Sequence, residues 1–423
     1  MQAKRILCLS DAMEDMQHFT QDYQVDFFEI EQISPVEYTE IYFKELYGTL
    51  KSDVDLSAID LIVAEYVESL ILVNLLRVDG FICPAIFIPH TNPYPLDIFC
   101  YFLLNRLLSH PEDLVLCGSN NAAQAYRRLL GINAKSICTF GMKDLHSNRI
   151  DKATAREHLG LPMNEELLLY TGRLMEDKGI NELCEAIALV RIERPNVRLV
   201  ISATHIESGY YNLIAPKLKD AILFYRLRRE DLVRLYNSAD LYVSCATSIY
   251  ETYGKSQLEA IAAGLPVIVP EWDGFPHYIN SSNGLLARVD FFEGPYQSPF
   301  QFCKVDIDDF SKKCIAALNN ITQFSPRNEP WAQYSTAVRD IRSVVSTILE
   351  QTEIIHSSSD RKTSGTFEHT GSTKLFMDEY SFDLESLSFN EISERGIICR
   401  EEIGSVELRK SLHHSIFNPD KNH

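Results

Sequence analysis

Positive charge is scarce in this chain. Its 423 residues include 59 Asp and Glu but only 40 Lys and Arg, which gives a formal net charge of −19. Nucleic-acid binders usually carry a basic stripe, and proteins that bind anionic lipid surfaces carry clustered Lys and Arg. Neither pattern is present in the sequence. We therefore expect no nucleic acid and no anionic membrane surface as a partner.

Long hydrophobic runs and paired cysteines are also missing. No run reaches the roughly 20 apolar residues of a transmembrane helix, and the apolar run within Met1–Ser10 is too short for a signal peptide. Ile98–Leu104 is interpreted as a buried helix, with a membrane-interface helix as the alternative. The ten cysteines form no C-x-x-C pair, and several, such as Cys8 and Cys117, lie in apolar runs. Unpaired core cysteines are typical of a reducing compartment, so we expect a cytoplasmic protein.

The chain does contain a regular alternation of short apolar runs with helical patterns. The apolar runs form two series, at Arg5–Ser10, Leu61–Ala64, Pro84–Ile88 and Leu114–Cys117, and then at Leu167–Thr171, Arg198–Ser202, Ile222–Phe224, Leu241–Ser244 and Pro266–Val269. Segments between them, such as Ile180–Glu193, have helical spacing. This alternation predicts an α/β fold with two doubly wound parallel sheets.

The domain boundary is expected between the two series. We assign residues 1–148 and 149–325 to two Rossmann-like domains. Residues 326–355 contain a long amphipathic pattern, Trp331–Leu349, and residues 356–423 form a C-terminal extension. That polar tail is expected to be partly disordered, because it has too few apolar residues for a core of its own.

Doubly wound sheets bind ligands beyond the carboxyl ends of their strands. The strand positions alone therefore select a set of candidate residues, without any motif. They are Ser10, Asp11, Glu65, His90, Ser119, Gly172, Arg173, Ala203, Ser244 and Pro270–Asp273.

The most informative stretch is 248–264. Two carboxylates, Glu251 and Glu259, lie eight positions apart, the first in a loop and the second in the apolar helix that follows. Gly254 and Lys255 lie between them, where that helix is expected to begin. A helix N-terminus binds anions through its backbone N–H groups and its dipole, and carboxylates accept hydrogen bonds from sugar hydroxyls. The stretch therefore predicts a site for a nucleotide sugar.

This stretch resembles the E-x7-E motif of the retaining, GT-B-type glycosyltransferases of family 4. Tyr170–Gly179 looks like the G-R-x4-K-G signature of that family, and Arg229–Ser244 looks like its L-Y-x-x-A-D-L segment, in the same order. The resemblance implies two Rossmann-like domains that face a cleft, the N-terminal one on the acceptor side. It also implies that the last helix, within 326–355, crosses back to the N-terminal domain.

The resemblance implies roles for particular residues. Arg173 and Lys178, beside Gly172, are expected to bind the diphosphate of the donor, where fixed positive charge lowers the barrier as the leaving group gains negative charge. Glu259 is expected to bind the ribose hydroxyls. Glu251 is expected to bind the hydroxyls of the donor sugar and to support positive charge near its anomeric carbon.

Further donor contacts are expected around these four. The backbone amides of Tyr253, Gly254 and Lys255 are candidates for phosphate or sugar oxygens, although Lys255 is equally well explained as an ordinary first-turn residue. Arg226 and Leu227 stand where the family has a glycine-containing segment that faces the nucleotide base. Uridine is the default base, so a UDP-sugar is the expected donor.

The acceptor side is less well defined. His90 follows a predicted strand in a proline-rich loop, and the resemblance implies contact with the donor sugar or the acceptor; a structural histidine is the alternative. Asn92 and Ser119 are weaker candidates. The family's first loop is rich in glycine, whereas Ser10–Asp15 contains none. No particular acceptor is therefore predicted.

The sequence predicts no metal site and no cofactor other than the donor. Asp53 and Asp55 have D-x-D spacing but no further ligand beside them, and in GT-B enzymes Arg, Lys and a helix dipole take the place of a metal. We expect a retaining, metal-independent hexosyltransferase with Glu251, Arg173, Lys178 and His90 as its catalytic residues. The alternatives are a non-catalytic carbohydrate-binding or partner subunit, and another GT-B enzyme such as an epimerase or phosphorylase.

Overall fold

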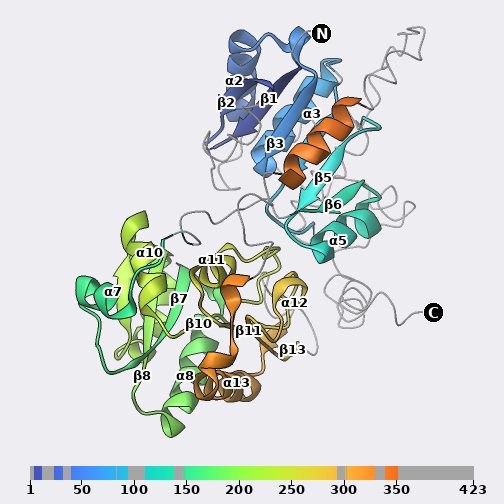
Figure 1. Cartoon of the computed structure of the whole chain (residues 1–423). Helices are drawn as coiled ribbons and strands as arrows, with labels where there is room; N and C mark the ends of the chain where they lie inside the picture. Colours follow the sequence, from blue (N-terminus) through green and yellow to red (C-terminus); the bar gives the residue numbers. More distant parts are fainter. Residues whose placement is uncertain are drawn as a thin grey trace, which may run out of the picture. The chain divides into compact units, whose positions relative to one another are not determined.

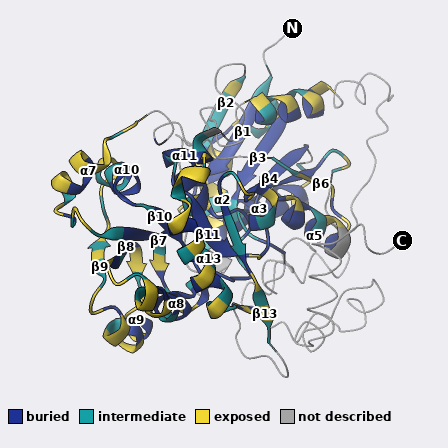
Figure 2. Cartoon of the chain, turned by 60° about the horizontal axis from the view of Figure 1, so that its bottom comes forward, coloured by how far each residue is buried: buried dark blue, intermediate teal, exposed yellow. Residues whose placement is uncertain are grey.

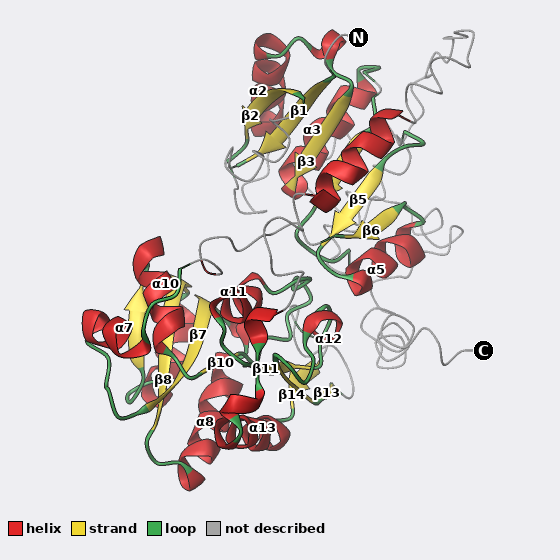
Figure 3. Ribbon diagram, in the orientation of Figure 1, coloured by secondary structure: helices red, strands yellow, loops and turns green. Residues whose placement is uncertain are grey.

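The computed structural model describes residues 4–11, 23–31, 40–81, 83–93, 110–137, 145, 148–292, 301, 303–328 and 339–350. These residues belong to two compact units, which are described separately (Figures 1 and 3). Unit 1 contains the described residues up to 137 and those from 339 to 350, and unit 2 contains those between 145 and 328. The predicted tail, 356–423, and Ile98–Leu104 lie outside the described residues.

Unit 1 is built on a six-stranded parallel sheet. Its strands are β1 (Arg5–Ser10), β2 (Gln24–Glu29), β3 (Leu61–Glu65), β4 (Ala85–Ile88), β5 (Leu114–Cys117) and β6 (Ala134–Ser136), in the order β2-β1-β3-β4-β5-β6. Its helices include α2 (Glu40–Asp53), α3 (Tyr66–Val78) and α5 (Asn120–Leu130), with a 3₁₀ turn η2 (Leu56–Ala58). The direction of winding reverses between β1 and β3, which is the switch point of this sheet.

Alternate residues of the unit 1 strands pack on opposite faces of the sheet. Leu7 and Leu9 belong to a buried cluster with α2, α3 and α5, whereas Ile6 and Cys8 pack with the helical residues 339–350. Those residues form the orange helix that lies over the strands of this unit in Figure 1. Because both faces are covered, the central strands β3, β4 and β5 are buried at every position, and β3 and β4 are dark blue in Figure 2.

Unit 2 is built on a second six-stranded parallel sheet. Its strands are β7 (Glu166–Leu174), β8 (Val197–Ile206), β9 (Ile222–Tyr225), β10 (Leu241–Val243), β11 (Val267–Pro270) and β12 (Gly284–Ala287), in the order β12-β11-β10-β7-β8-β9. The winding starts at β7, runs outward to β9 and resumes at β10 on the other side of β7. The switch point, and the expected ligand site, therefore lie between β7 and β10.

Helices cover the unit 2 sheet, and a short antiparallel pair, β13 (Val289–Phe291) and β14 (Cys303–Val305), lies beside it. The helices are α7 (Lys152–Leu159), α8 (Ile180–Glu193), α9 (Ser208–Ile214), α10 (Arg229–Ser238), α11 (Lys255–Ala263), α12 (Phe275–Tyr278) and α13 (Ile307–Asn319), with 3₁₀ turns η3 (Glu176–Lys178), η4 (Ala215–Lys217), η5 (Ile321–Gln323) and η6 (Pro326–Asn328). Within the described part of the chain, no helix combines the length and the apolarity that a membrane crossing requires.

The division between the units falls between residues 139 and 140, earlier than the predicted boundary after 148. The side chain of Asn237 in α10 ties residues 148 and 150 to unit 2. Its Oδ1 accepts a hydrogen bond from the N–H of Ile150, and its Nδ2 donates to the carbonyl of Asn148. Asp151 then caps α7 by accepting from the N–H of Thr154 at 3.0 Å. The chain is thus already tied to unit 2 at residue 148.

Candidate functional site

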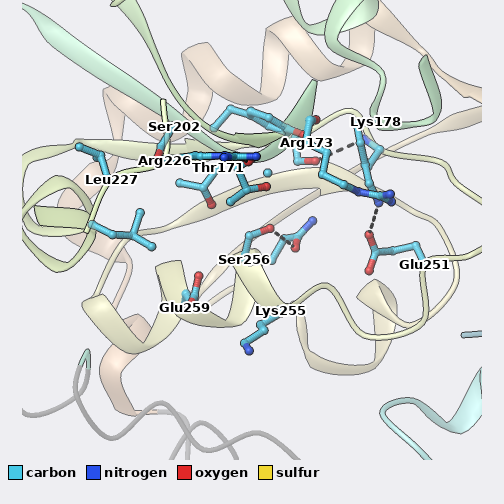
Figure 4. Close-up of a pocket in the computed structure, with 17 residues that line it drawn as sticks. Thr171, Arg173, Lys178, Ser202, Arg226, Leu227, Glu251, Lys255, Ser256 and Glu259 are labelled. Carbon is cyan, nitrogen blue, oxygen red and sulfur yellow. Dashed lines mark hydrogen bonds and ion pairs between the residues drawn. The ribbon is translucent and has the colours of Figure 1, made fainter. Parts of the chain in front are cut away.

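A cavity of about 440 Å³ opens at the carboxyl ends of β7, β8, β9 and β10 in unit 2 (Figure 4). This is the switch point of the sheet. Strand ends and the loops after them provide one part of the lining, and α11 with the loop before it provides another. The lining residues are Tyr170, Thr171, Gly172, Arg173, Lys178, Ser202, Thr204, Arg226, Leu227, Leu232, Ser244, Ala246, Glu251, Lys255, Ser256, Gln257 and Glu259.

The end of β7 depends on a glycine. Gly172 has φ +150°, and a Cβ at this position would lie 2.8 Å from the hydroxyl of Tyr170. That hydroxyl donates a 2.8 Å hydrogen bond to the carbonyl of Arg173. The glycine therefore lets the strand end close over the Tyr170 hydroxyl, which fixes the backbone from which the Arg173 side chain extends.

A buried carboxylate lies beside two cations of the cavity. Asp177 Oδ2 is 3.6 Å from Nζ of Lys178 and 3.9 Å from a guanidinium nitrogen of Arg173. The two cations differ in exposure, because the Arg173 side chain is 47% exposed and the Lys178 side chain 14%. Arg173 is thus the more accessible cation, while Lys178 is held within the site.

The next residue, Gly179, has φ +64°, and a Cβ there would lie 2.3 Å from the carbonyl oxygen of Cys245.

Glu251 is held by two donors. Its Oε2 lies 3.1 Å from Nζ of Lys178, and its Oε1 accepts a 2.9 Å hydrogen bond from the N–H of Gly254. The structure therefore uses the Gly254 amide, a candidate phosphate contact, to hold Glu251. A carboxylate fixed at both oxygens still has lone pairs for sugar hydroxyls.

Glu259 is held by two donors from α10. The Tyr236 hydroxyl donates to Oε2 at 2.8 Å, and a guanidinium nitrogen of Arg229 lies 2.6 Å from Oε1. Thr171 Oγ1 lies 2.7 Å from the Tyr236 oxygen. Burial, and then the negative charge of Glu259, raise the pKa of Tyr236 well above its usual value. The hydroxyl thus stays protonated and orients the carboxylate.

Helix α11 begins at Lys255, directly after Gly254, whose φ is +71°. A Cβ at Gly254 would lie 2.6 Å from both the Phe275 ring and the side chain of Gln257, so the close packing here requires glycine. Lys255, Ser256 and Glu259 lie on this helix along one side of the cavity (Figure 4). The positive end of the helix dipole is therefore at the cavity, where it favours an anion.

Of two other candidate residues, Arg226 lines the cavity and Tyr253 does not. Tyr253 is buried and does not line the cavity; its carbonyl accepts a hydrogen bond from Tyr278. Arg226 lines the cavity with Leu227 and has a left-handed backbone, with φ +52°. The Arg226 guanidinium lies over the Tyr225 ring, 5.1 Å from its centroid. Leu227 and Glu251 lie at opposite sides of the view in Figure 4.

The remaining candidates belong to unit 1. His90 Nε2 lies 2.5 Å from Glu65 Oε1. Ser119 is the N-cap of α5 and accepts a hydrogen bond from the N–H of Ala122 at 3.1 Å, which gives it a structural role. Asn92 is fully buried. Unit 1 thus brings His90 and Glu65 together, both of which the strand-end rule selects.

Sequence reasoning missed several polar groups of the unit 2 site. Asp177 lies inside a recognised motif, but the motif does not show that its carboxylate is buried beside Arg173 and Lys178. Arg229 and Tyr236 lie in the segment that resembles the L-Y-x-x-A-D-L pattern, yet nothing in the sequence links them to Glu259. The hydroxyl-bearing residues Ser202, Thr204 and Ser256 also line the cavity; of these, the first two lie near the end of β8, where the strand-end rule selected Ala203.

The described residues contain no group of three or more His, Cys, Asp or Glu side chains that could hold a metal ion. Asp55, half of the D-x-D pair, instead caps η2 by accepting from the N–H of Ser57.

Comparison with known families concerns mainly unit 2. Residues 151–290 match the family model described as glycosyl transferases group 1. The matched residues make up about a third of the 423-residue chain. The match contains the entire lining of the cavity, from Tyr170 to Glu259.

Two curated relatives illustrate the range of the sequence matches. The chain is 33% identical over 146 residues to an uncharacterized glycosyltransferase, MJ1607, of Methanocaldococcus jannaschii, which is 34% of this chain and 37% of the relative. It is 27% identical over 213 residues to a D-inositol 3-phosphate glycosyltransferase of Corynebacterium aurimucosum, which is 47% of this chain and 48% of the relative. The matches thus span less than half of these relatives.

Solved structures resemble more of the chain. Sucrose-phosphate synthase from Thermosynechococcus elongatus has a TM-score of 0.59 at 18% identity, over 84% of this chain and 98% of that one. Anabaena HepE in complex with UDP-glucose has a TM-score of 0.57 at 17% identity, over 84% of this chain and 100% of that one. At this identity the likeness concerns the fold, which is the GT-B type with two Rossmann-like domains.

Proposed function

We propose that the chain is a retaining, metal-independent glycosyltransferase that moves a sugar from a nucleotide-diphosphate sugar to an acceptor hydroxyl. The observation that carries the proposal is that two cations, Arg173 and Lys178, and two carboxylates, Glu251 and Glu259, line one cavity at the switch point of unit 2. Their spacing in the chain alone did not require this. A UDP-sugar is the proposed donor, since HepE, a protein of similar fold, was solved with UDP-glucose.

The proposed binding mode follows from the chemistry of the lining. Glu259, oriented by Tyr236 and Arg229, accepts hydrogen bonds from the ribose diol. Arg173, Lys178 and the N-terminal end of α11 bind the diphosphate, whose negative charge they complement. The donor sugar then lies near Glu251, which accepts hydrogen bonds from its hydroxyls.

In the proposed reaction, the bond between the anomeric carbon and the diphosphate oxygen breaks as the acceptor oxygen attacks from the same face. Negative charge grows on the leaving diphosphate, and Arg173 and Lys178 stabilise it more strongly than in the bound donor. The acceptor proton passes to the departing phosphate oxygen. Glu251 stabilises the positive charge on the sugar ring. No protein base is assigned to this step.

The test combines binding, turnover and stereochemistry. Isothermal titration with UDP and UDP-glucose measures donor binding, and UDP release with and without acceptor measures turnover. Water and inositol 3-phosphate serve as first acceptors, because one relative carries the latter in its name. Proton NMR of the product reports the anomeric configuration. An α-linked product supports retention. Donor binding with no sugar release would instead support the non-catalytic carbohydrate-binding subunit.

A cytoplasmic location is also proposed. The seven cysteines in the described part of the chain are all buried, as expected for cysteines used for packing in a reducing compartment. Measurement of free thiols in freshly isolated protein tests this; blocked thiols would contradict it.

A further inference from the structure

The loop that carries Glu251 is long and buried. It runs from Ser244 to Gly254, between β10 and α11. Most of its residues are buried, and Thr247 and Ser248 are fully so. Loops usually lie at the surface, because a buried loop must find hydrogen-bond partners for its backbone polar groups within the protein. The partners of this loop therefore show what holds Glu251 in place.

A turn within the loop places Glu251. The N–H of Glu251 donates a 3.1 Å hydrogen bond to the carbonyl of Ser248, three positions earlier. The same carbonyl accepts a 2.9 Å hydrogen bond from the indole N–H of Trp272. A carbonyl oxygen has two lone pairs, so it can accept from both donors at once. Trp272 therefore contacts the turn at the atom that closes it.

Trp272 comes from another part of unit 2. It follows β11 by two residues, and its side chain is buried. Its ring lies beside that of Phe291, the last residue of β13, with the ring centroids 6.4 Å apart. The indole has a single polar hydrogen. The packing of the ring therefore decides where that hydrogen points.

The segment that contains β14 holds the loop a second time. Ser248 forms an isolated antiparallel bridge with Gln301. The hydroxyl of Thr247 donates a 2.8 Å hydrogen bond to the carbonyl of Cys303 and accepts one of 2.8 Å from Nε2 of Gln301. The loop is thus attached at two consecutive residues, four and three positions before Glu251.

We propose that Trp272 is a positioning residue, which holds the turn from Ser248 to Glu251 so that the Glu251 carboxylate faces the donor sugar, and that Thr247 supports the turn from the side of β14. Trp272 acts through the backbone, since it does not line the cavity. That the ligand of Glu251 is a sugar rests on the proposed glycosyltransferase function. The fixing of the carboxylate does not, and is tested separately.

Four variants of the full-length chain provide the test. Trp272→Phe keeps an aromatic ring but removes the indole N–H. Thr247→Val keeps the shape of the side chain but removes the hydroxyl, which Thr247→Ser restores. Tyr210→Phe is the matched control, because it removes a buried hydroxyl that accepts a 3.1 Å hydrogen bond from the N–H of Asn181, away from the cavity lining.

The first measurement is hydrogen–deuterium exchange without ligand, resolved to single amides by mass spectrometry with electron-transfer fragmentation. The N–H groups of Glu251 and Gly254 donate to the Ser248 carbonyl and to Oε1 of Glu251, so they report on the turn and on the carboxylate. We expect both to exchange about tenfold faster in Trp272→Phe and Thr247→Val, and at the native rate in Thr247→Ser and Tyr210→Phe.

Two outcomes of this measurement would overturn the proposal. The first is native exchange at both amides in Trp272→Phe. The second is an equal increase in Tyr210→Phe, which would trace the effect to a general loss of stability. Native exchange in Thr247→Val alone would remove Thr247 from the proposal.

The second measurement compares UDP with UDP-glucose by isothermal titration and follows UDP release. We expect Trp272→Phe not to weaken the binding of UDP, but to lower the affinity for UDP-glucose and kcat/KM about tenfold each, because Glu251 is assigned to the sugar. Trp272→Phe/Glu251→Ala should match Glu251→Ala, which has no carboxylate to position. Equal losses of affinity for both ligands, or losses that multiply in the double variant, would refute the positioning role.

The two measurements separate the two proposals. If the variants show the expected exchange but the native chain neither binds UDP-glucose nor releases UDP, the proposed function is contradicted and the fixed carboxylate is established. If the native chain transfers sugar and Trp272→Phe binds UDP-glucose with native affinity, the role of Trp272 alone is contradicted.

Discussion

Lys178 and Glu251 pair with each other across the candidate site, with Nζ 3.1 Å from Oε2. The cation assigned to the diphosphate and the carboxylate assigned to the sugar are therefore one ion pair. A diphosphate must compete with Glu251 for Lys178, and a sugar hydroxyl must compete with Lys178 for Glu251. In the proposed binding mode, binding of the diphosphate and binding of the sugar are thereby coupled through this pair.

The pair gives opposite expectations for binding and turnover. Glu251→Gln removes the negative charge that Lys178 shares, so we expect UDP to bind at least as tightly as in the native chain. Transfer should fall about 10²-fold, the size reported for loss of one transition-state contact. Titration with UDP and initial rates of UDP release measure the two effects. UDP affinity that falls in step with turnover would contradict this account of the pair.

Arg173→Ala should reduce kcat by roughly 10²–10³-fold, because Arg173 would face the charge that grows on the leaving diphosphate. Its side chain is 47% exposed and its ion pair with Asp177 spans 3.9 Å, so the melting temperature should hardly change. Arg234→Ala is the matched control, since Arg234 also forms an ion pair, at 2.8 Å with Asp231, but does not line the cavity. Equal activity of the two variants would remove Arg173 from the mechanism.

Tyr236→Phe tests the orientation of Glu259. Loss of one hydrogen bond to a charged group is worth about 1.5–3 kcal/mol, which corresponds to roughly ten-fold or more in affinity. We expect UDP to bind correspondingly more weakly to the variant, whereas 2′-deoxy-UDP, which lacks one ribose hydroxyl, should be much less affected. Titration of both nucleotides against both proteins measures the difference. Equal losses of affinity for the two nucleotides would show that Glu259 does not bind the ribose hydroxyls.

Alanine substitutions at two glycines distinguish the cost of a left-handed backbone from the cost of a steric clash. Gly160 and Gly179 have φ values of +65° and +64°, but nothing lies within 4 Å of a Cβ at Gly160, whereas a Cβ at Gly179 meets the Cys245 carbonyl at 2.3 Å. Gly160→Ala should cost about 1–2 kcal/mol of unfolding free energy from the left-handed backbone alone. Gly179→Ala should cost a further ~1–3 kcal/mol. Denaturant titration measures both, and similar losses would mean that the backbone near Cys245 yields easily.

We expect the folding stability of unit 2 to depend on pH through the carboxyl group of Asp306. The N–H of Asp309, and then the guanidinium of Arg288, lower the pKa of its carboxyl group below the usual value. This stabilisation is present above the unfolded-state pKa of about 3.9 and is lost as the pH falls through the lower folded-state pKa. In Asp306→Asn, which still caps α13, stability should fall less steeply below about pH 4. Unfolding curves at a series of pH values compare the two; parallel pH profiles would rule this contribution out.

The central strands of the two six-stranded sheets could be predicted from the sequence, whereas only β9 among their edge strands could. Arg5–Ser10 and Leu114–Cys117 agree with β1 and β5 to the residue, because strands buried on both faces are continuous apolar runs. The unpredicted strands β2, β6 and β12 all lie at sheet edges. The edge strand Gln24–Glu29 is polar at alternate positions and largely half-buried, so it lacks such a run.

The sequence predicted residues that line the site, but not the hydrogen bonds and ion pairs between them. The spacing of Glu251 and Glu259 indicated a loop carboxylate and a helix carboxylate, and both line the cavity. Their partners come from distant segments: Lys178 lies 73 positions from Glu251, and Arg229 lies 30 positions from Glu259. Such contacts depend on how α10 and η3 pack, which no local pattern encodes.

Arg226 and Leu227 line the cavity from a position just past the end of β9, outside the strands that form the core of unit 2. Donor choice can therefore be re-engineered with little risk to folding. A library restricted to Arg226 and Leu227, at the end of the partly exposed strand β9, would vary the wall proposed for the base while the diphosphate contacts stay constant. A glycine at position 226 would also relieve the left-handed strain there, so new specificities should be obtainable among variants as stable as the starting protein.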